Sequence, residues 1–203
     1  MTILVTGGAG YIGSHFVRYL ERKKIEFVIV DNFSTGHKKF VKNKKFFELD
    51  LKDPEEIRVN LQDLDITSIV HFAGLSIVSD SQKMEKEYYE NNVLASMNLA
   101  KFAVEKKIRK FIYSSSAAVY GIPIEIPIKE NHPTKPINNY GLSKMGGEAS
   151  VRMYKNSLIV RASMTEKPFI HKQAFYDFIT NFLYHEDFTK LIFKILDQKG
   201  IIN

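Results

Sequence analysis

Tyr140 and Lys144 stand four residues apart in the run NNYGLSK, residues 138–144. Residues i and i+4 share one face of a helix, so the lysine is expected to lie one turn from the tyrosine. A free tyrosine, with a pKa of about 10, is a poor base at neutral pH. A nearby ammonium favours the phenolate and lowers that pKa. The pair therefore predicts a tyrosine general base tuned by a lysine, although the same spacing also occurs on exposed helix faces.

A serine triplet supplies the next candidate group. The run SSSAAVYG, residues 114–121, begins where an apolar run predicts the end of a buried strand. Ligands of open α/β sheets bind at the carboxyl ends of the strands. Ser116, 24 residues before Tyr140, is therefore expected to hold the substrate hydroxyl or carbonyl that the tyrosine protonates and deprotonates. The alternative for such a triplet is a polar loop.

A glycine-rich run, TGGAGYIG at residues 6–13, places Gly7, Gly10 and Gly13 in the spacing G-x-x-G-x-x-G. It lies between an expected strand and an expected helix, which is the context of a dinucleotide-binding turn. The glycines allow a sharp turn and close approach to a pyrophosphate, and the helix N-terminus favours that anion. Asp31 follows 18 residues after Gly13, near the distance expected for an acid that binds the adenosine ribose. An aspartate there repels a 2′-phosphate and predicts NAD rather than NADP.

The elements that must position these groups follow from the spacing of apolar residues. The expected strands are 2–6, 27–31, a short one within 46–53, 68–74, 110–116 and 157–163. The expected helices are 11–23, 54–61, 88–107 and 140–154. Pro54 suits a first helical position. Gly146 and Gly147 each cost their helix about 1 kcal/mol relative to alanine.

Strands that alternate with helices predict βαβ crossovers and a doubly wound parallel sheet, the Rossmann arrangement, in the α/β class. Residues 1–164 are expected to form the NAD-binding domain with the catalytic residues. Residues 165–203 are expected to form a short or truncated substrate-binding part, with a helix, Gly200 as its C-cap and a final short strand. The proline-rich loop 121–138 is expected to lie over a site.

Composition excludes several classes of protein. The 203 residues contain no cysteine, which excludes disulfides and thiolate zinc sites. The net charge is +6, but no arginine-rich stripe with interleaved aromatics predicts nucleic-acid binding. No apolar run approaches the roughly 20 residues of a membrane span, and the N-terminus does not resemble a signal peptide. No grouping has metal spacing: His71 is expected to be structural, and His171 has no patterned partner. We therefore expect a cytoplasmic protein without metal, membrane or nucleic-acid partners.

Six ordered motifs resemble the extended short-chain dehydrogenase/reductase superfamily. They are TGGAGYIGSH, DNFSTGH, HFAGLS, YYENNV, SSSAAVYG and YGLSK. Within that superfamily, residues 1–150 are most similar to the UDP-glucose 4-epimerases. Residues 160–178 look more like the dTDP-4-dehydrorhamnose reductases.

The resemblance implies a bound NAD, a nucleotide-sugar substrate with a UDP-hexose favoured, and a homodimer paired through two helices per subunit. It implies Ser116, Tyr140 and Lys144 as catalytic residues, with the last two also touching the cofactor. The other implied cofactor contacts are Gly7, Gly10, Tyr11, Ile12 and Gly13 at the pyrophosphate, Asp31 and Asn32 at the ribose, Asp50 and Leu51 at the adenine, Phe72, Ala73 and Gly74 along the cofactor, and Asn92 and Ser114 near the nicotinamide.

Two departures from the epimerase pattern keep other functions open. The run RASM, residues 161–164, lacks the tyrosine and asparagine of the epimerases, and Ser76 stands where many of them carry lysine. The first hypothesis is an NAD-dependent nucleotide-sugar 4-epimerase that works through a 4-keto intermediate. The alternatives are a reductase of 4-keto-6-deoxyhexose nucleotides or another dehydratase-family enzyme, a non-catalytic NAD-binding module, and a truncated gene product.

Overall fold

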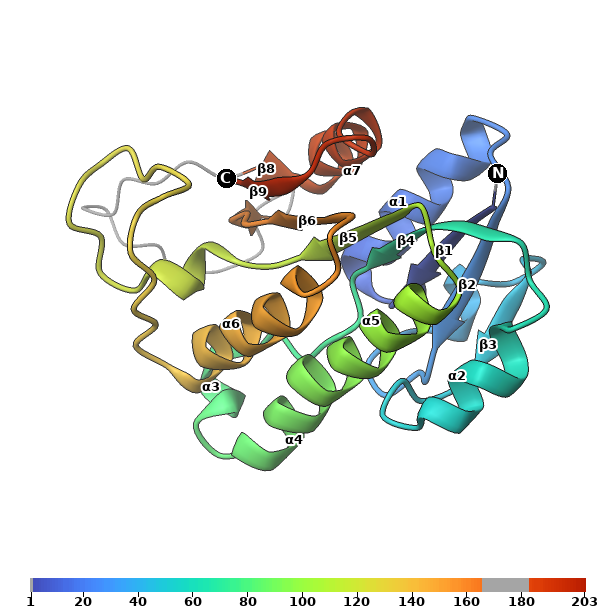
Figure 1. The fold of residues 1–203 in the computed structure, drawn as a ribbon, viewed down its shortest axis with the longest axis horizontal. Coiled ribbons are helices and arrows are strands. Elements are labelled where there is room, and N and C mark those ends of the chain that lie inside the picture. The colour runs from blue at the N-terminus through green and yellow to red at the C-terminus, as the bar shows by residue number, and fades with distance from the viewer. Residues whose placement is uncertain (1, 166–182) are drawn as a thin grey trace.

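The computed structural model describes residues 2–165 and 183–203 and is built on one seven-stranded parallel sheet (Figure 1). The strands run in the order β3-β2-β1-β4-β5-β6-β9. Their bounds are β1 Thr2–Thr6, β2 Phe27–Asp31, β3 Phe46–Glu48, β4 Ile66–His71, β5 Lys110–Ser114, β6 Ser157–Val160 and β9 Gly200–Ile202. A separate pair joins β7 Met164–Thr165 to β8 Leu183–Tyr184.

Helices cover both faces of the sheet (Figure 1). One face carries α2 Pro54–Leu61, α5 Ala95–Glu105 and α6 Asn139–Arg152, and the other carries α1 Tyr11–Arg22 and α7 His185–Lys194. The shorter segments are α3 Val78–Ser81, α4 Glu85–Tyr89, the π-helical turn η2 Glu90–Leu94, and the 3₁₀ turns η1 Lys38–Phe40 and η3 Ala117–Tyr120.

The strand order confirms the predicted doubly wound α/β fold. From β1 the chain builds outward through β2 and β3, and it then crosses back to build β4, β5 and β6 on the other side. The sheet therefore reverses its direction of growth between β1 and β4. Ligands of such sheets bind at the carboxyl ends of the strands beside this reversal.

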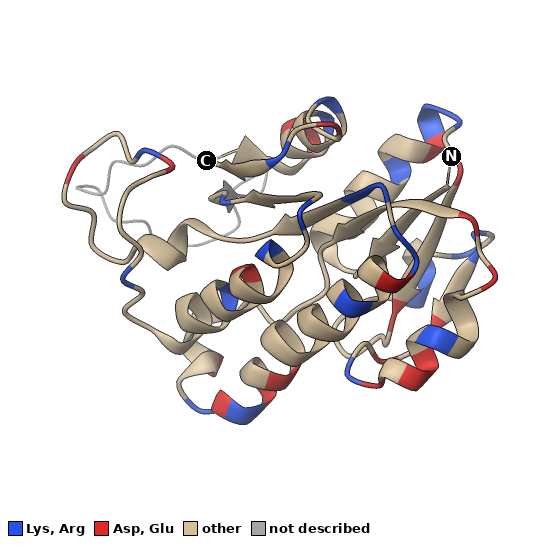
Figure 2. Cartoon of the chain, viewed as in Figure 1, with Lys and Arg blue, Asp and Glu red and all other residues tan. Residues whose placement is uncertain are grey.

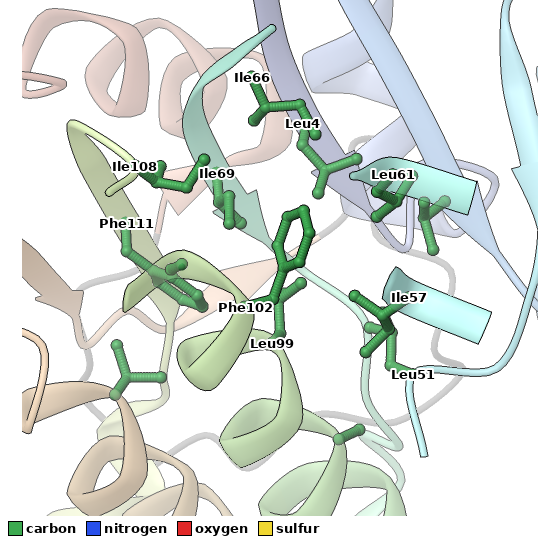
Figure 3. Close-up of a cluster of buried hydrophobic side chains, with 14 of the residues drawn as sticks. Leu4, Leu51, Ile57, Leu61, Ile66, Ile69, Leu99, Phe102, Ile108 and Phe111 are labelled. Atoms are coloured by element: carbon green, nitrogen blue, oxygen red, sulfur yellow. The ribbon is translucent and has the colours of Figure 1, made fainter. Parts of the chain in front are cut away.

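Two buried apolar clusters fix the helices to the sheet. Figure 3 shows the first, in which Leu4 and Ile69 from the strands meet Leu99 and Phe102 of α5. The second lies on the opposite face and includes Phe188 of α7. Strand β9 pairs in parallel with β6 and so extends the same sheet. Helix α7 packs into the second cluster through Phe188 and Ile192.

Three local expectations are wrong. The helix expected over 88–107 is α4, η2 and α5 in succession, because the chain makes a π-helical turn at Glu90–Leu94. Gly200 does not cap α7, which ends at Lys194; it opens β9 with a φ of +97°. The loop 121–138 does not lie over the cleft described below, since none of its residues lines it.

Basic and acidic residues are spread along the described chain and lie in most of its helices (Figure 2). Within the lysine-rich run 37–45, Lys38 pairs with Glu48 and Lys44 pairs with Glu21, each at 2.7 Å. These contacts fit a solvated surface segment. Among the helices of residues 2–165 and 183–203, none is long and apolar enough to cross a membrane.

Candidate active site

A cleft of about 710 Å³ opens at the carboxyl ends of β1, β2, β4 and β5. The predicted site residues that line it are Gly7, Gly10, Tyr11, Ile12, Gly13, Asp31, Asn32, Asp50, Leu51, Phe72, Ala73, Gly74, Ser116 and Tyr140. Asn92, Ser114 and Lys144 do not line the cleft, and all three are buried. The structure thus brings residues from six separated motifs to one concave surface whose size suits a large ligand.

The glycine turn needs its glycines for steric reasons. Gly7 has a φ of +69°, and a Cβ there would lie 2.6 Å from the backbone nitrogen of Ala73. A Cβ on Gly13 would lie 2.1 Å from the carbonyl oxygen of Gly7. Gly10 is the N-cap of α1, and no side chain caps that end. The first turn of α1 lines the cleft, and its N-cap has no side chain that would block an anion there, as a diphosphate site requires.

Asp31 ends β2 and is anchored to the glycine turn. Its carboxylate accepts hydrogen bonds from the backbone nitrogens of Ala9 at 2.9 Å and Phe33 at 2.8 Å. A carboxylate offers about four acceptor positions, so two remain for a ligand at the cleft. Asp31 is thus held where a ribose diol can donate to it.

Tyr140 and Ser116 meet at the far end of the cleft. Ser116 caps η3, and its hydroxyl accepts a hydrogen bond from the backbone nitrogen of Ala118 at 3.2 Å. Burial raises the pKa of Tyr140, and a hydrogen bond with the Ser116 side chain lowers it by a smaller amount. Lys144 is not a cause of either shift. Burial therefore dominates the pKa of Tyr140, and the tuning of the tyrosine by Lys144 stays a prediction.

Lys144 lies one turn along α6, behind the cleft lining. Its ammonium sits over the ring of Tyr113, 4.6 Å from the ring centroid. Burial lowers the pKa of Lys144 to about 8, and the Glu148 carboxylate acts in the opposite direction. The protonated fraction of Lys144 therefore changes with pH near neutrality, and neighbouring charges can shift it.

Asn92, within the π-helical turn, joins two parts of the site. Its side-chain oxygen accepts from the backbone nitrogen of Leu75 at 2.8 Å, and its amide donates to the Leu75 carbonyl at 2.9 Å and to the Ser143 hydroxyl at 2.8 Å. Ser143 in turn donates to the carbonyl of Tyr140 at 2.8 Å. Asn92 thus links the loop after β4 to the helix that carries the tyrosine and lysine.

The sequence alone did not identify His185, which lines the cleft from the start of α7. Its ring lies 4.2 Å from that of Tyr11 and stacks on His15 at 5.5 Å. No local pattern marks it, because its position depends on how α7 packs against α1. His171 and most of the segment 160–178 lie outside the described residues, so the likeness of that segment to the reductases stays a prediction.

His71 occupies a structural position, as its place in a buried strand suggested. It is fully buried; its Nδ1 is 2.6 Å from the Thr6 hydroxyl, and its Nε2 is 3.0 Å from the Ser96 hydroxyl. Burial, with a smaller contribution from Lys144, lowers the pKa of His71 to about 3. The ring is therefore neutral in the folded protein at any pH above about 4.

This predicts a loss of stability in mild acid that belongs to one residue. Below its ordinary pKa of about 6.5, His71 takes up a proton in the unfolded chain but not in the folded one. Relative to His71→Gln, the protein should lose about 1.4 kcal/mol of unfolding free energy for each pH unit between about 6 and 4. Urea unfolding of both proteins at several pH values measures the difference. Stability curves that run parallel across this range would show that His71 is not buried neutral.

Comparison with known proteins places this site in a family. The sequence model of the NAD dependent epimerase/dehydratase family matches residues 3–167. The UDP-glucose 4-epimerase of Halalkalibacterium halodurans is 41% identical over 148 residues, which are 73% of this chain and 44% of that protein. The Bordetella bronchiseptica enzyme WbmG in complex with NAD superposes with a TM-score of 0.89 at 27% identity, over 100% of this chain and 72% of that one. The same enzyme in complex with NAD and UDP gives 0.86 at 27% identity, over 99% and 71%.

The family match spans the glycine turn, the serine triplet and the Tyr140–Lys144 pair. The chain itself spans less than half the length of the curated relatives that it matches. The match to the family nevertheless covers most of this chain. By its sequence, its parallel sheet and its cleft, this chain belongs to the NAD dependent epimerase/dehydratase family.

Proposed function

We propose that this chain binds NAD and acts as a nucleotide-sugar 4-epimerase, with a UDP-hexose as substrate. The observation that carries the proposal is one continuous cleft, with the glycine turn and Asp31 at one end and the paired Ser116 and Tyr140 at the other. The relative from Halalkalibacterium halodurans is named a UDP-glucose 4-epimerase. WbmG was solved with NAD and with NAD and UDP. Both likenesses support the same substrate class.

The residues of the cleft fit NAD. Side chains at Gly7 or Gly13 would collide with backbone atoms, so the turn keeps the close form that a pyrophosphate approaches. Asp31 offers free acceptor positions to an adenosine ribose and would repel the extra phosphate of NADP. Bound NAD would supply an acceptor for a hydride from the sugar and return that hydride to the opposite face of the carbon.

The chain's own residues handle the proton. The phenolate oxygen of Tyr140 takes the proton of the C4 hydroxyl, and Ser116 hydrogen-bonds the same sugar oxygen. When the C4 hydroxyl is restored in its inverted configuration, the tyrosine gives the proton back, so no net acid or base is consumed. Burial favours the neutral phenol, and a charged Lys144 would favour the phenolate. The lysine thus assists catalysis only while it carries its proton.

Two further parts of the proposal concern the whole protein. A homodimer stays a prediction; support for it comes from α5, which leaves Val104 55% exposed and Met97 37% exposed. A cytoplasmic location also stays a prediction.

The test is proton NMR of UDP-galactose incubated with the purified protein and catalytic NAD, following the anomeric signals. We expect the UDP-glucose signal to grow until it exceeds that of UDP-galactose, without net formation of NADH. If folded protein that binds NAD converts nothing, the epimerase proposal for this substrate fails. Net oxidation of NADH with a 4-keto nucleotide sugar would instead support the reductase. NAD binding without any turnover would support a binding module.

A further inference from the structure

Glu148 is a buried acid on the catalytic helix that the epimerase reaction does not use directly. It lies one turn beyond Lys144 on α6, and its side chain is 3% exposed. One carboxylate oxygen accepts from the Ser115 hydroxyl at 2.5 Å and from Nε of Arg161 at 2.9 Å. The other accepts from Nη2 of Arg161 at 2.7 Å. The carboxylate is therefore fixed from two strands, at the ends of β5 and β6.

The network around Glu148 extends to the C-terminal strand. Nη1 of Arg161 donates to the Tyr120 hydroxyl at 2.9 Å, and Tyr120 donates to the side-chain oxygen of Asn203 at 2.5 Å. The Asn203 amide donates to the carbonyl of Ile128 at 3.0 Å. The backbone nitrogen of Arg161 also donates to the Ile202 carbonyl at 2.8 Å. The end of β9 and the loop 121–138 thus reach the catalytic helix through Arg161 and Glu148.

Stability alone is a weak reason for such a pair. Burying two charges costs free energy that their attraction only partly recovers, and apolar residues of similar size often do as well. The position of Glu148 suggests another use, because residues i and i+4 face the same side of a helix. Lys144 is the neighbour that this position reaches. Its ammonium is buried and needs a negative group to remain charged.

Among the described polar and titratable groups around Lys144, Glu148 is the one that carries a negative charge. On α6 the positions one turn away hold Tyr140 and Glu148, on β5 the ring of Tyr113 lies against the ammonium, and on β4 the ring of His71 is neutral. Burial keeps both tyrosines in the neutral phenol form. The neighbouring π-helical turn contributes Asn92, which has no charge. Among these described groups, Glu148 is the anion that favours the ammonium, and the face of the Tyr113 ring adds a weaker attraction.

We infer that Glu148 is a positioning residue that acts through Lys144: its buried carboxylate, held by Arg161 and Ser115 one helical turn from the lysine, keeps Lys144 charged. The role of Lys144 in this statement rests on the proposed function. The electrostatic link itself does not, and it can be measured without NAD or substrate. Glu148 does not line the cleft, so its effect on the reaction passes through the lysine.

The test is an NMR titration of Lys144 in the NAD-free protein. The protein is labelled with ¹³C at lysine Cε, and the Lys144 signal is identified as the one missing in Lys144→Met. We expect its midpoint near pH 8. In Glu148→Gln, which removes the charge at nearly constant size, the midpoint should fall by about one pH unit. Glu148→Asp keeps the charge and should lower the midpoint by less than about half of that.

A second variant guards against misfolding, because Glu148→Gln leaves Arg161 buried without its partner. The double variant Glu148→Gln/Arg161→Gln has no unpaired charge, and its two amides can hydrogen-bond each other. Glu148 is the charged group that raises the pKa of Lys144, so the midpoint of the double variant should also fall, by no more than in Glu148→Gln. A midpoint that stays in place in folded Glu148→Gln or in the double variant would overturn the inference. If the Lys144 midpoint falls in Glu148→Gln but the unmodified protein does not convert UDP-galactose, the inference holds and only the proposed function is contradicted.

Discussion

Tyr140→Phe should stop the conversion of UDP-galactose while leaving the affinity for NAD within about twofold. The substitution removes one oxygen, the atom that exchanges the proton with the sugar hydroxyl. General acid–base groups contribute about 10² to 10⁴ in rate, so we expect a loss of about 10³-fold. The ring of Tyr140 lies against the cleft and is retained. The glycine turn and Asp31, which would hold the dinucleotide, lie at the other end of the cleft.

The matched control is Tyr88→Phe, because Tyr88 also lines the cleft and also loses only a hydroxyl. That hydroxyl donates to the carbonyl of Ile77 at 2.5 Å. Its removal should therefore weaken a loop contact and reduce the rate by no more than about tenfold. The NMR assay gives the rate, and calorimetric titration gives the NAD affinity. If Tyr140→Phe keeps a rate near that of Tyr88→Phe, the tyrosine is not the base and the proposed mechanism is wrong.

The parts of the fold that follow from local patterns were predictable from the sequence. The strands β1 and β2 have the predicted bounds, because each is a short apolar run closed by a turn. Helix α2 also begins at Pro54 as predicted, with Asp53 as its cap. The glycine turn was equally predictable from its spacing, and a Cβ on Gly13 would lie 2.1 Å from the carbonyl oxygen of Gly7, six residues earlier. Patterns of this kind depend on neighbours in sequence.

The features that were missed depend on distant contacts. The π-helical turn carries the same apolar spacing as a regular helix over its short length. What reveals it is that Asn92 bonds to Leu75 and Ser143, which come from other parts of the chain. The pKa of Tyr140 is raised because the assembled fold buries it. The helical spacing of Tyr140 and Lys144 in the sequence gives no information on that burial. In the sequence, Glu148 does not differ from other polar helix residues, because its partner Arg161 lies on another element.

The two glycines of α6 show how the structure separates residues that the sequence treats alike. Both were expected to cost the helix about 1 kcal/mol. A Cβ on Gly147 would lie 2.2 Å from the Tyr113 hydroxyl and 2.7 Å from the carbonyl oxygen of Asn92. For a Cβ on Gly146 the three nearest atoms all belong to the side chain of Val93, the first at 2.8 Å. Gly147 therefore sits where α6 comes closest to β5 and the π-helical turn, and Gly146 faces a side chain that can turn away.

Gly147→Ala should therefore destabilise the protein by about 2 kcal/mol, because overpacking of about 3 kcal/mol exceeds the gain in helix propensity. Gly146→Ala should stay within about 1 kcal/mol of the unmodified chain. Urea unfolding measures both. Under conditions where both variants are folded, the NMR assay should show that Gly147→Ala is about 10²-fold slower than the unmodified chain, because moving α6 displaces Tyr140 and Lys144 together. Gly146→Ala should keep its rate. Equal rates in the two variants would mean that α6 absorbs the extra methyl without moving its catalytic face. The close approach at Gly147 would then serve packing alone.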